Sequence, residues 1–185
     1  MNFYSSIGKF HESTGKYEIS DMVSVIKEDG HDSVYISVMP GLWEEHDSTD
    51  EIRKQASAAG LETIDLFLPE EMDKYLNEKS FLLRSENSDP DLKVKIKLLE
   101  MVDATIYSYM KGFWKDPSSV NSELTDSVFR AKHLLMSAVV PSFELGVWKM
   151  WHNKMKEKLL KIEDNNIAVI VNVESRYWFM DNLHS

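Results

Sequence analysis

Ile167-Ala168-Val169-Ile170-Val171, near the end of the chain, is the stretch that decides the fold. It is continuous in apolar residues and rich in β-branched side chains, which is typical of a strand covered on both faces. Strands of this kind lie inside parallel sheets, with helices packed on each side. The sequence therefore predicts a buried strand that extends to Val173.

The chain up to Leu68 alternates between strand and helix patterns. Short strands are predicted at Phe3 to Ile7, Ser33 to Met39 and Leu61 to Leu68. Two helices are expected between them, and the second opens at a capping box formed by Ser48 and Glu51. Strands that alternate with helices are connected by right-handed crossovers, which make neighbouring strands parallel.

The following part, residues 80–163, is expected to be predominantly helical. A helix from Asp91 to Tyr109 has apolar residues at helical spacing, and further helices are expected from Thr125 to Val140 and from Phe143 to Ile162. The stripe predicted to face the core in the first of these helices consists of Val94, Leu98, Val102 and Ile106.

These elements predict one α/β domain that covers residues 1–185. Its centre is a mostly parallel sheet of about four or more strands, with helices on both faces. A helical segment is inserted before the last strand, and residues 164–185 form that returning strand.

Composition limits the classes of function. The chain has 31 acidic and 21 basic residues, a formal charge of −10, and no cysteine. The negative charge argues against binding to nucleic acid, and the lack of cysteine excludes disulfides and thiolate metal sites. No secretory signal or apolar run long enough to span a membrane is found, so a soluble cytoplasmic protein is expected.

Two strand ends carry the functional signal. The first strand runs into Gly8-Lys9-Phe10-His11, and the last runs into Asn172-Val173-Glu174-Ser175. In open parallel sheets, binding and reactive groups gather just beyond the carboxyl ends of the strands. Of these two ends, only the first has a histidine.

The order of these units resembles the TraB/PrgY-like proteins, which belong to a wider group with the Tiki proteases, the ChaN-like haem-binding proteins and the erythromycin esterases. Members open with a strand that ends in Gly-x-x-His, as Gly8 to His11 does. A later strand of the family ends in a Glu where this chain has Ser37. The closing Gly-x-x-His of the family corresponds to Asn172 to Ser175, with both key residues changed. The resemblance implies hydrolytic or metal-linked chemistry in the family, and of its two His and one Glu this chain retains His11.

His11 is the main catalytic candidate, because a neutral imidazole can act as a general base or as a metal ligand. Asp65 and Glu174 could assist it if their strands are adjacent, and a divalent metal would need such additional ligands. The alternative is that His11 caps a helix or bonds to a loop carbonyl. The candidate ligand-binding residues at the strand ends are Gly8, Glu12, Ser37, Asn172, Ser175 and Arg176.

Two functions remain open. The first is a non-catalytic or regulatory protein, a pseudoenzyme that binds a partner or a small ligand. The second is a divergent hydrolase in which His11 activates water. Trp148, Trp151 and Met155 mark a region where a protein partner or a second copy could dock, although core packing also explains them. Neither nucleic acid nor a membrane is expected as a partner.

Overall fold

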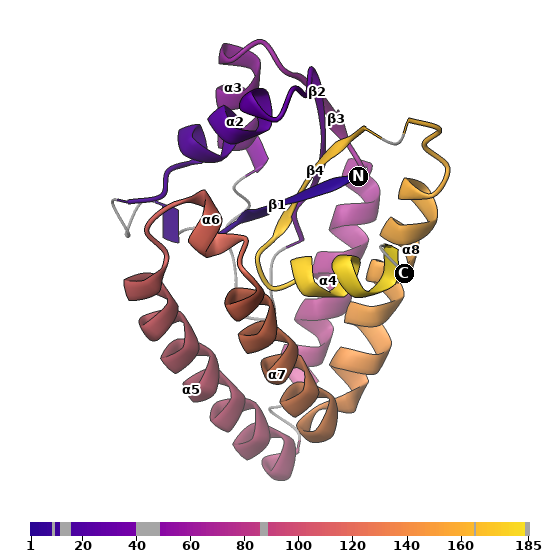
Figure 1. Ribbon diagram of the computed structural model, residues 1–185. Coiled ribbons are helices and arrows are strands. Elements are labelled where there is room, and N and C mark those ends of the chain that lie inside the picture. The colour runs from indigo at the N-terminus through magenta and orange to yellow at the C-terminus, as the bar shows by residue number, and fades with distance from the viewer. Residues whose placement is uncertain (9, 12–15, 40–48, 86–88, 165, 184–185) are drawn as a thin grey trace.

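Four parallel strands form the centre of the molecule in the computed structural model, which describes residues 1–185 except 9, 12–15, 40–48, 86–88, 165 and 184–185 (Figure 1). The order across the sheet is β1-β4-β2-β3. The strands are β1 (Asn2–Ser6), β2 (Ser33–Ser37), β3 (Glu62–Asp65) and β4 (Ala168–Asn172). The last strand is thus an inner strand, as its apolar sequence predicts.

The register of the sheet brings the two ends of the chain together. Tyr4 of β1 and Ile36 of β2 both lie opposite Ile170 of β4. All five residues of β4 are buried, because neighbouring strands cover both edges and helices cover both faces.

Consecutive residues of β1 show that both faces of the sheet are covered. The ring of Phe3 stacks on Phe179 of helix α9 (Arg176–Leu183), with 5.3 Å between centroids. The hydroxyl of Tyr4 donates a 2.5 Å hydrogen bond to Asp29, which follows helix α2 (Ile19–Glu28). Since neighbouring side chains in a strand point to opposite faces, α2 and α9 lie on opposite faces of the sheet. The predicted parallel α/β architecture is confirmed.

The remaining helices include those predicted from the sequence and one, the short α6, that was not predicted. They are α3 (Thr49–Ala58), α4 (Pro69–Ser85), α5 (Pro90–Phe113), α6 (Pro117–Val120), α7 (Glu123–Val139), the π-helix η2 (Ser142–Trp148) and α8 (Lys149–Leu159). Ser48 of the predicted capping box lies outside the described residues. Residues 164–185 contain helix α9 as well as the returning strand, and α9 was not predicted.

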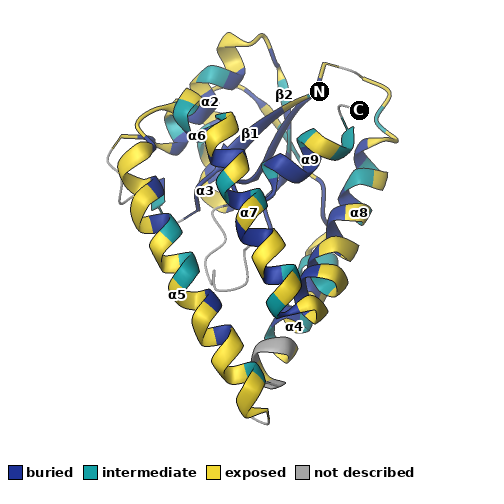
Figure 2. Ribbon diagram, turned by 60° about the horizontal axis from the view of Figure 1, so that its bottom comes forward, coloured by how far each residue is buried: buried dark blue, intermediate teal, exposed yellow. Residues whose placement is uncertain are grey.

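The helical part extends away from the sheet. In Figure 2, α5, α7 and α8 run below the sheet, with their buried residues mostly on the sides that face one another. Trp114 follows α5 and packs against Phe129 of α7, with 6.3 Å between ring centroids. Both side chains are fully buried, so this region shares the core of the sheet.

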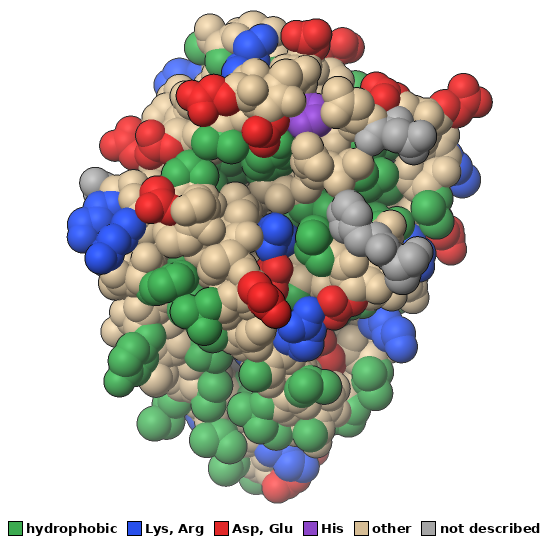
Figure 3. Space-filling view, viewed as in Figure 1, with side chains coloured by type: hydrophobic (Ala, Val, Ile, Leu, Met, Phe, Trp, Pro, Cys, Tyr) green, Lys and Arg blue, Asp and Glu red, His purple; other side chains and the backbone are tan. Residues whose placement is uncertain are grey.

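The predicted inner face of α5 is correct only in its second half, where Val102 and Ile106 are partly buried and Ile106 packs against the core. Val94 and Leu98, in its first half, are 70% and 52% exposed. Hydrophobic side chains are frequent on the lower half of the molecule in Figure 3, where the helical part lies. The buried apolar residues of α5 are Ile96, Leu99, Tyr107 and Met110. This face also carries the mostly buried Asp103, whose carboxylate pairs with Lys132 of α7. Because the buried face contains this acidic residue, its apolar spacing is interrupted. The sequence pattern therefore favoured the uninterrupted stripe that begins at Val94.

Candidate functional site

The ends of β1 and β4 lie side by side, as parallel strands with this register require. The amide of Val173 donates to the carbonyl of Ser6 at 2.9 Å. Beyond this bond, Phe10 stacks on Tyr107 of α5 with 4.5 Å between ring centroids, and the hydroxyl of Tyr107 donates to Glu174 Oε1 at 2.5 Å. The segments after the two strands therefore meet at α5.

Glu174 is the centre of a buried ionic cluster. Lys132 Nζ lies 2.7 Å from Glu174 Oε1 and also pairs with Asp103. His133 Nε2 lies 3.6 Å from Glu174 Oε2. Burial alone would raise the pKa of Glu174, but the charges of Lys132 and His133 outweigh it and hold that pKa below its usual range. Glu174 is therefore an ionised group held in place by its neighbours.

The cluster continues into the π-helix. His133 Nδ1 lies 2.7 Å from Glu144 Oε1. Burial by itself lowers the pKa of His133, but the carboxylates of Glu144 and Glu174 outweigh this effect and raise it. Sequence reasoning did not select Tyr107, Lys132, His133 or Glu144 for this site. One usable signal was Lys132, a charged residue at helical spacing with the buried Phe129 and Met136.

His11 has both ring nitrogens engaged by the backbone. Its Nε2 accepts a 3.1 Å hydrogen bond from the amide of Ile7, so Nδ1 carries the proton and donates to the carbonyl of Tyr17 at 3.1 Å. Burial lowers the pKa of His11 to about 4, which keeps it neutral near pH 7. This geometry leaves no nitrogen lone pair for a metal or a substrate proton. It agrees with the alternative interpretation of His11, in which the imidazole bonds to a loop carbonyl.

Gly8 has a conformational reason for its place before His11. Its φ of 55° lies in the left-handed region, where a side chain is unfavourable. The turn that follows closes through hydrogen bonds from Phe10 to Ile7 (3.1 Å) and from His11 to Gly8 (3.2 Å). The Gly-x-x-His pattern thus describes a tight turn after β1. Glu12 lies outside the described residues.

Asp65 does not meet His11. It ends β3, at the opposite edge of the sheet from β1, with β4 and β2 between them. Its carboxylate accepts hydrogen bonds of 3.0 and 3.1 Å from Arg53 Nη2 of α3. Both residues line a hollow of about 290 Å³ beside β2 and β3. The structure therefore separates Asp65 from His11, two of the three predicted catalytic residues.

The serines at the strand ends are buried and bonded. Ser37 donates its hydroxyl to the sulfur of Met155, and Ser175 Oγ lies 2.8 Å from His152 Nε2. His152 Nδ1 lies 2.8 Å from the carbonyl of Trp148, so Nε2 accepts from Ser175. This is the geometry of a nucleophile and its base. However, Ser175 and His152 are 2% and 0% exposed, so a substrate cannot reach them in this conformation.

Asn172 completes the turn after β4. Its Oδ1 accepts a 2.9 Å hydrogen bond from the amide of Glu174, and its carbonyl accepts a 2.8 Å bond from the amide of Ser175. Asn172 is 1% exposed. It therefore shapes the backbone that directs Glu174 into the ionic cluster.

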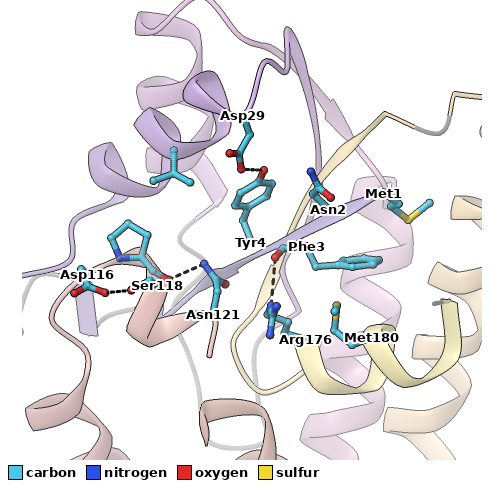
Figure 4. A pocket seen from close by; sticks show the side chains of 12 residues that line it. Met1, Asn2, Phe3, Tyr4, Asp29, Asp116, Ser118, Asn121, Arg176 and Met180 are labelled. Atoms are coloured by element: carbon cyan, nitrogen blue, oxygen red, sulfur yellow. Dashed lines mark hydrogen bonds between the residues drawn. The ribbon is translucent and has the colours of Figure 1, made fainter. Parts of the chain in front are cut away.

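Arg176 lies beside β1 and not in the ionic cluster of Glu174. Its Nε donates to the carbonyl of Phe3 at 3.3 Å, and its guanidinium pairs with the buried Asp126. It lines an open cavity of about 580 Å³ beside β1 (Figure 4). The other lining residues come from β1, α2, α6, α9 and their flanks: Met1, Asn2, Phe3, Tyr4, Val25, Asp29, Asp116, Pro117, Ser118, Asn121 and Met180.

Side chains cap the outer edge of β1 within this region. Besides the bond from Arg176 to Phe3, the amide of Ser5 donates to Asn121 Oδ1 at 2.8 Å. The carbonyl of Ser5 accepts a 3.0 Å bond from the hydroxyl of Tyr17. An added strand would have to displace these groups. The cavity therefore suits a small molecule better than an extended peptide.

The region proposed for docking belongs to the core. Trp148, Trp151 and Met155 are 4%, 1% and 0% exposed, so their side chains offer no surface to a partner. Trp151 packs edge-on against Phe67 and Tyr75. These three residues are therefore explained by core packing, the alternative to a docking surface.

Within the described part of the chain, no group of three or more His, Asp or Glu side chains could hold a metal ion. No helix in that part is both long and apolar enough to cross a bilayer.

No protein-family model, curated protein or solved structure significantly matches the chain.

Proposed function

We propose that the protein is a non-catalytic binding protein, a TraB/PrgY-like pseudoenzyme that holds a small ligand in the cavity beside β1. One observation carries the proposal: the polar groups at the ends of β1 and β4 bond to each other and to the surrounding helices, and are buried. His11, Glu174 and Ser175 are each at most 5% exposed. Arg176, by contrast, lines an open cavity.

The walls of the cavity define the kind of ligand. Its volume of about 580 Å³ falls in the range of small-molecule sites. Met1, Phe3 and Met180 provide an apolar side, and Asp29 and Asp116 provide hydrogen-bond acceptors (Figure 4). Asp126 already neutralises Arg176. We therefore propose a mostly apolar ligand that carries a hydrogen-bond donor.

The alternative, a hydrolase based on His11, has less support. His11 bonds to the backbone through both nitrogens, and Asp65 is held by Arg53 at the far edge of the sheet. General-base catalysis needs a free lone pair within reach of the substrate proton. The buried pair of Ser175 and His152 would need an opening of the core before it could act.

A cavity-filling variant tests the proposed ligand site. Small-molecule fragments that bind the wild type are first identified by ligand-observed NMR. In Val25→Trp, the indole is expected to occupy the cavity and to weaken fragment binding by about tenfold or more, since contact area is lost. Val94→Trp is the matched control, because Val94 is 70% exposed on α5. Fragments that bind Val25→Trp as tightly as Val94→Trp would contradict the site.

A further inference from the structure

A third and smaller hollow, separate from the cavity beside β1, opens between α7, η2 and α9. It has a volume of about 200 Å³. The residues that matter for its chemistry are Arg130, His133, Leu134, Glu144, Leu145 and Tyr177. It shares no lining residue with the cavity beside β1.

One oxygen in its wall has no hydrogen-bond partner. Glu144 Oε1 bonds to His133, but Glu144 Oε2 is buried and unsatisfied among the described residues. Glu144 is only 5% exposed. Leaving a buried polar atom unpaired costs about 1–3 kcal/mol, and more for a charged group. Such an atom in the wall of a hollow indicates a missing hydrogen-bond donor.

The charges of the buried cluster favour a cation as that donor. Among the described residues, three acidic side chains, from Asp103, Glu144 and Glu174, lie against two basic ones, Lys132 and His133. The acidic groups therefore outnumber the basic groups beside the unsatisfied oxygen of Glu144. A buried carboxyl oxygen needs a compensating donor, and a ligand with one positive charge suits this acidic surrounding.

Two positive side chains at the rim do not supply this compensation. Arg130 is already paired with Asp181 at 2.8 Å. Lys149 also lines the hollow but is exposed, so water screens its charge. Arg130 also lies 5.5 Å from the centre of the Tyr177 ring, which shows that this aromatic wall faces a cation.

The backbone that presents Glu144 is itself unusual. Glu144 lies in the seven-residue π-helix Ser142–Trp148, between α7 and α8. π-helical turns are rare and frequently occur at functional sites. Leu134 and Leu145, 66% and 59% exposed, add apolar surface to the lining. Such surface suits the stem of an alkyl ammonium.

We propose that this hollow binds a small organic cation with a primary ammonium group. Its N–H donates to Glu144 Oε2, and its short alkyl stem packs between Leu134 and Leu145. The site is independent of the ligand cavity beside β1, so either can fail without the other.

Propylammonium chloride is the probe for a titration at constant ionic strength. Two-dimensional NMR would follow the amide of Gly146 and the indole N–H of Trp148. Saturable shifts are expected with propylammonium. Sodium chloride and 1-propanol, which lack the ammonium group, are expected to give none. Equal shifts with 1-propanol, or shifts that grow linearly without saturation, would overturn the proposal.

Variants assign the binding to Glu144. Glu144→Gln removes the charge and is expected to weaken propylammonium binding about tenfold or more. Glu157→Gln, a change of an exposed carboxylate on α8, should bind like the wild type. Leu145→Arg places a tethered cation at the exposed rim and should block the site even if Glu144→Gln does not fold. Unchanged affinity in either Glu144→Gln or Leu145→Arg would refute the assignment.

Discussion

At the scale of single residues, the buried histidines act as structural groups. His11 bonds the turn after β1 to the segment before α2, and His152 joins α8 to Ser175. Burial lowers the pKa of His11 to about 4 and that of His152 to about 3. Both are therefore neutral in the folded protein at pH values where the unfolded chain is already protonated.

The pH dependence of stability follows from these two pKa values. The unfolded chain binds protons at these positions below about pH 6.5, whereas the folded protein does not until far lower pH. Their contribution is present above pH 6.5 and is lost as the pH falls. Between pH 6.5 and 5, the free energy of unfolding is expected to drop by roughly 2 kcal/mol per pH unit. Chemical denaturation at several pH values measures this slope.

His133 does not produce the loss of stability between pH 6.5 and 5, because its pKa in the folded protein is raised. Its stabilising contribution is complete below about pH 6.5 and is lost only as the pH rises through its folded pKa. In His11→Gln, which cannot be protonated, the slope should be about half that of the wild type. A wild-type stability that stays constant from pH 6.5 to 5 would show that the histidines are not buried as neutral groups.

Local sequence identified some of these residues and not others. Gly8, His11, Asn172 and Ser175 were found because they follow recognisable strands. Lys132, His133 and Glu144 were missed, because their proximity to Glu174 depends on how α7 and η2 pack against the end of β4. Distance along the chain carries no information about that packing.

At the scale of elements, strands were easier to predict than helix faces. The apolar run of β4 fixed its place inside the sheet, since only an inner strand buries every side chain. Helix α5 has apolar residues on two faces, and the face predicted from spacing is exposed at Val94 and Leu98 but partly buried at Val102 and Ile106. The π-helix gave no sequence signal, because its residues are also compatible with an ordinary α-helix.

The turn after β1 gives a prediction at this scale. Gly8→Ala is expected to destabilise the protein by about 1 kcal/mol, because alanine is disfavoured at a φ of 55°. Gly112→Ala in α5 is the matched control, for which the expected change in stability has the opposite sign. An added Cβ there meets nothing within 4 Å, so stability should rise by about 0.5–1 kcal/mol. Thermal and urea unfolding of both variants measure the difference, and equal effects would contradict the assigned turn.

In the molecule as a whole, the segments after β1 and β4 are buried, whereas the outer edge of β1 borders an open cavity. The segments after β1 and β4 meet buried residues of α5, α7 and α8, including the ionic cluster of Glu174. The edge of β1 faces the open cavity that contains Arg176 (Figure 4). We therefore propose binding at that edge, without chemistry at the strand ends.

An assay of hydrolysis shows whether the strand ends carry catalytic activity. Generic ester and peptide substrates are incubated with the wild type and with His11→Ala, with and without added Zn²⁺ or Mn²⁺, after circular dichroism has shown that both are folded. We expect no hydrolysis above the buffer rate from either protein. Hydrolysis by the wild type that disappears in folded His11→Ala would contradict the account, because His11 would then act on a substrate.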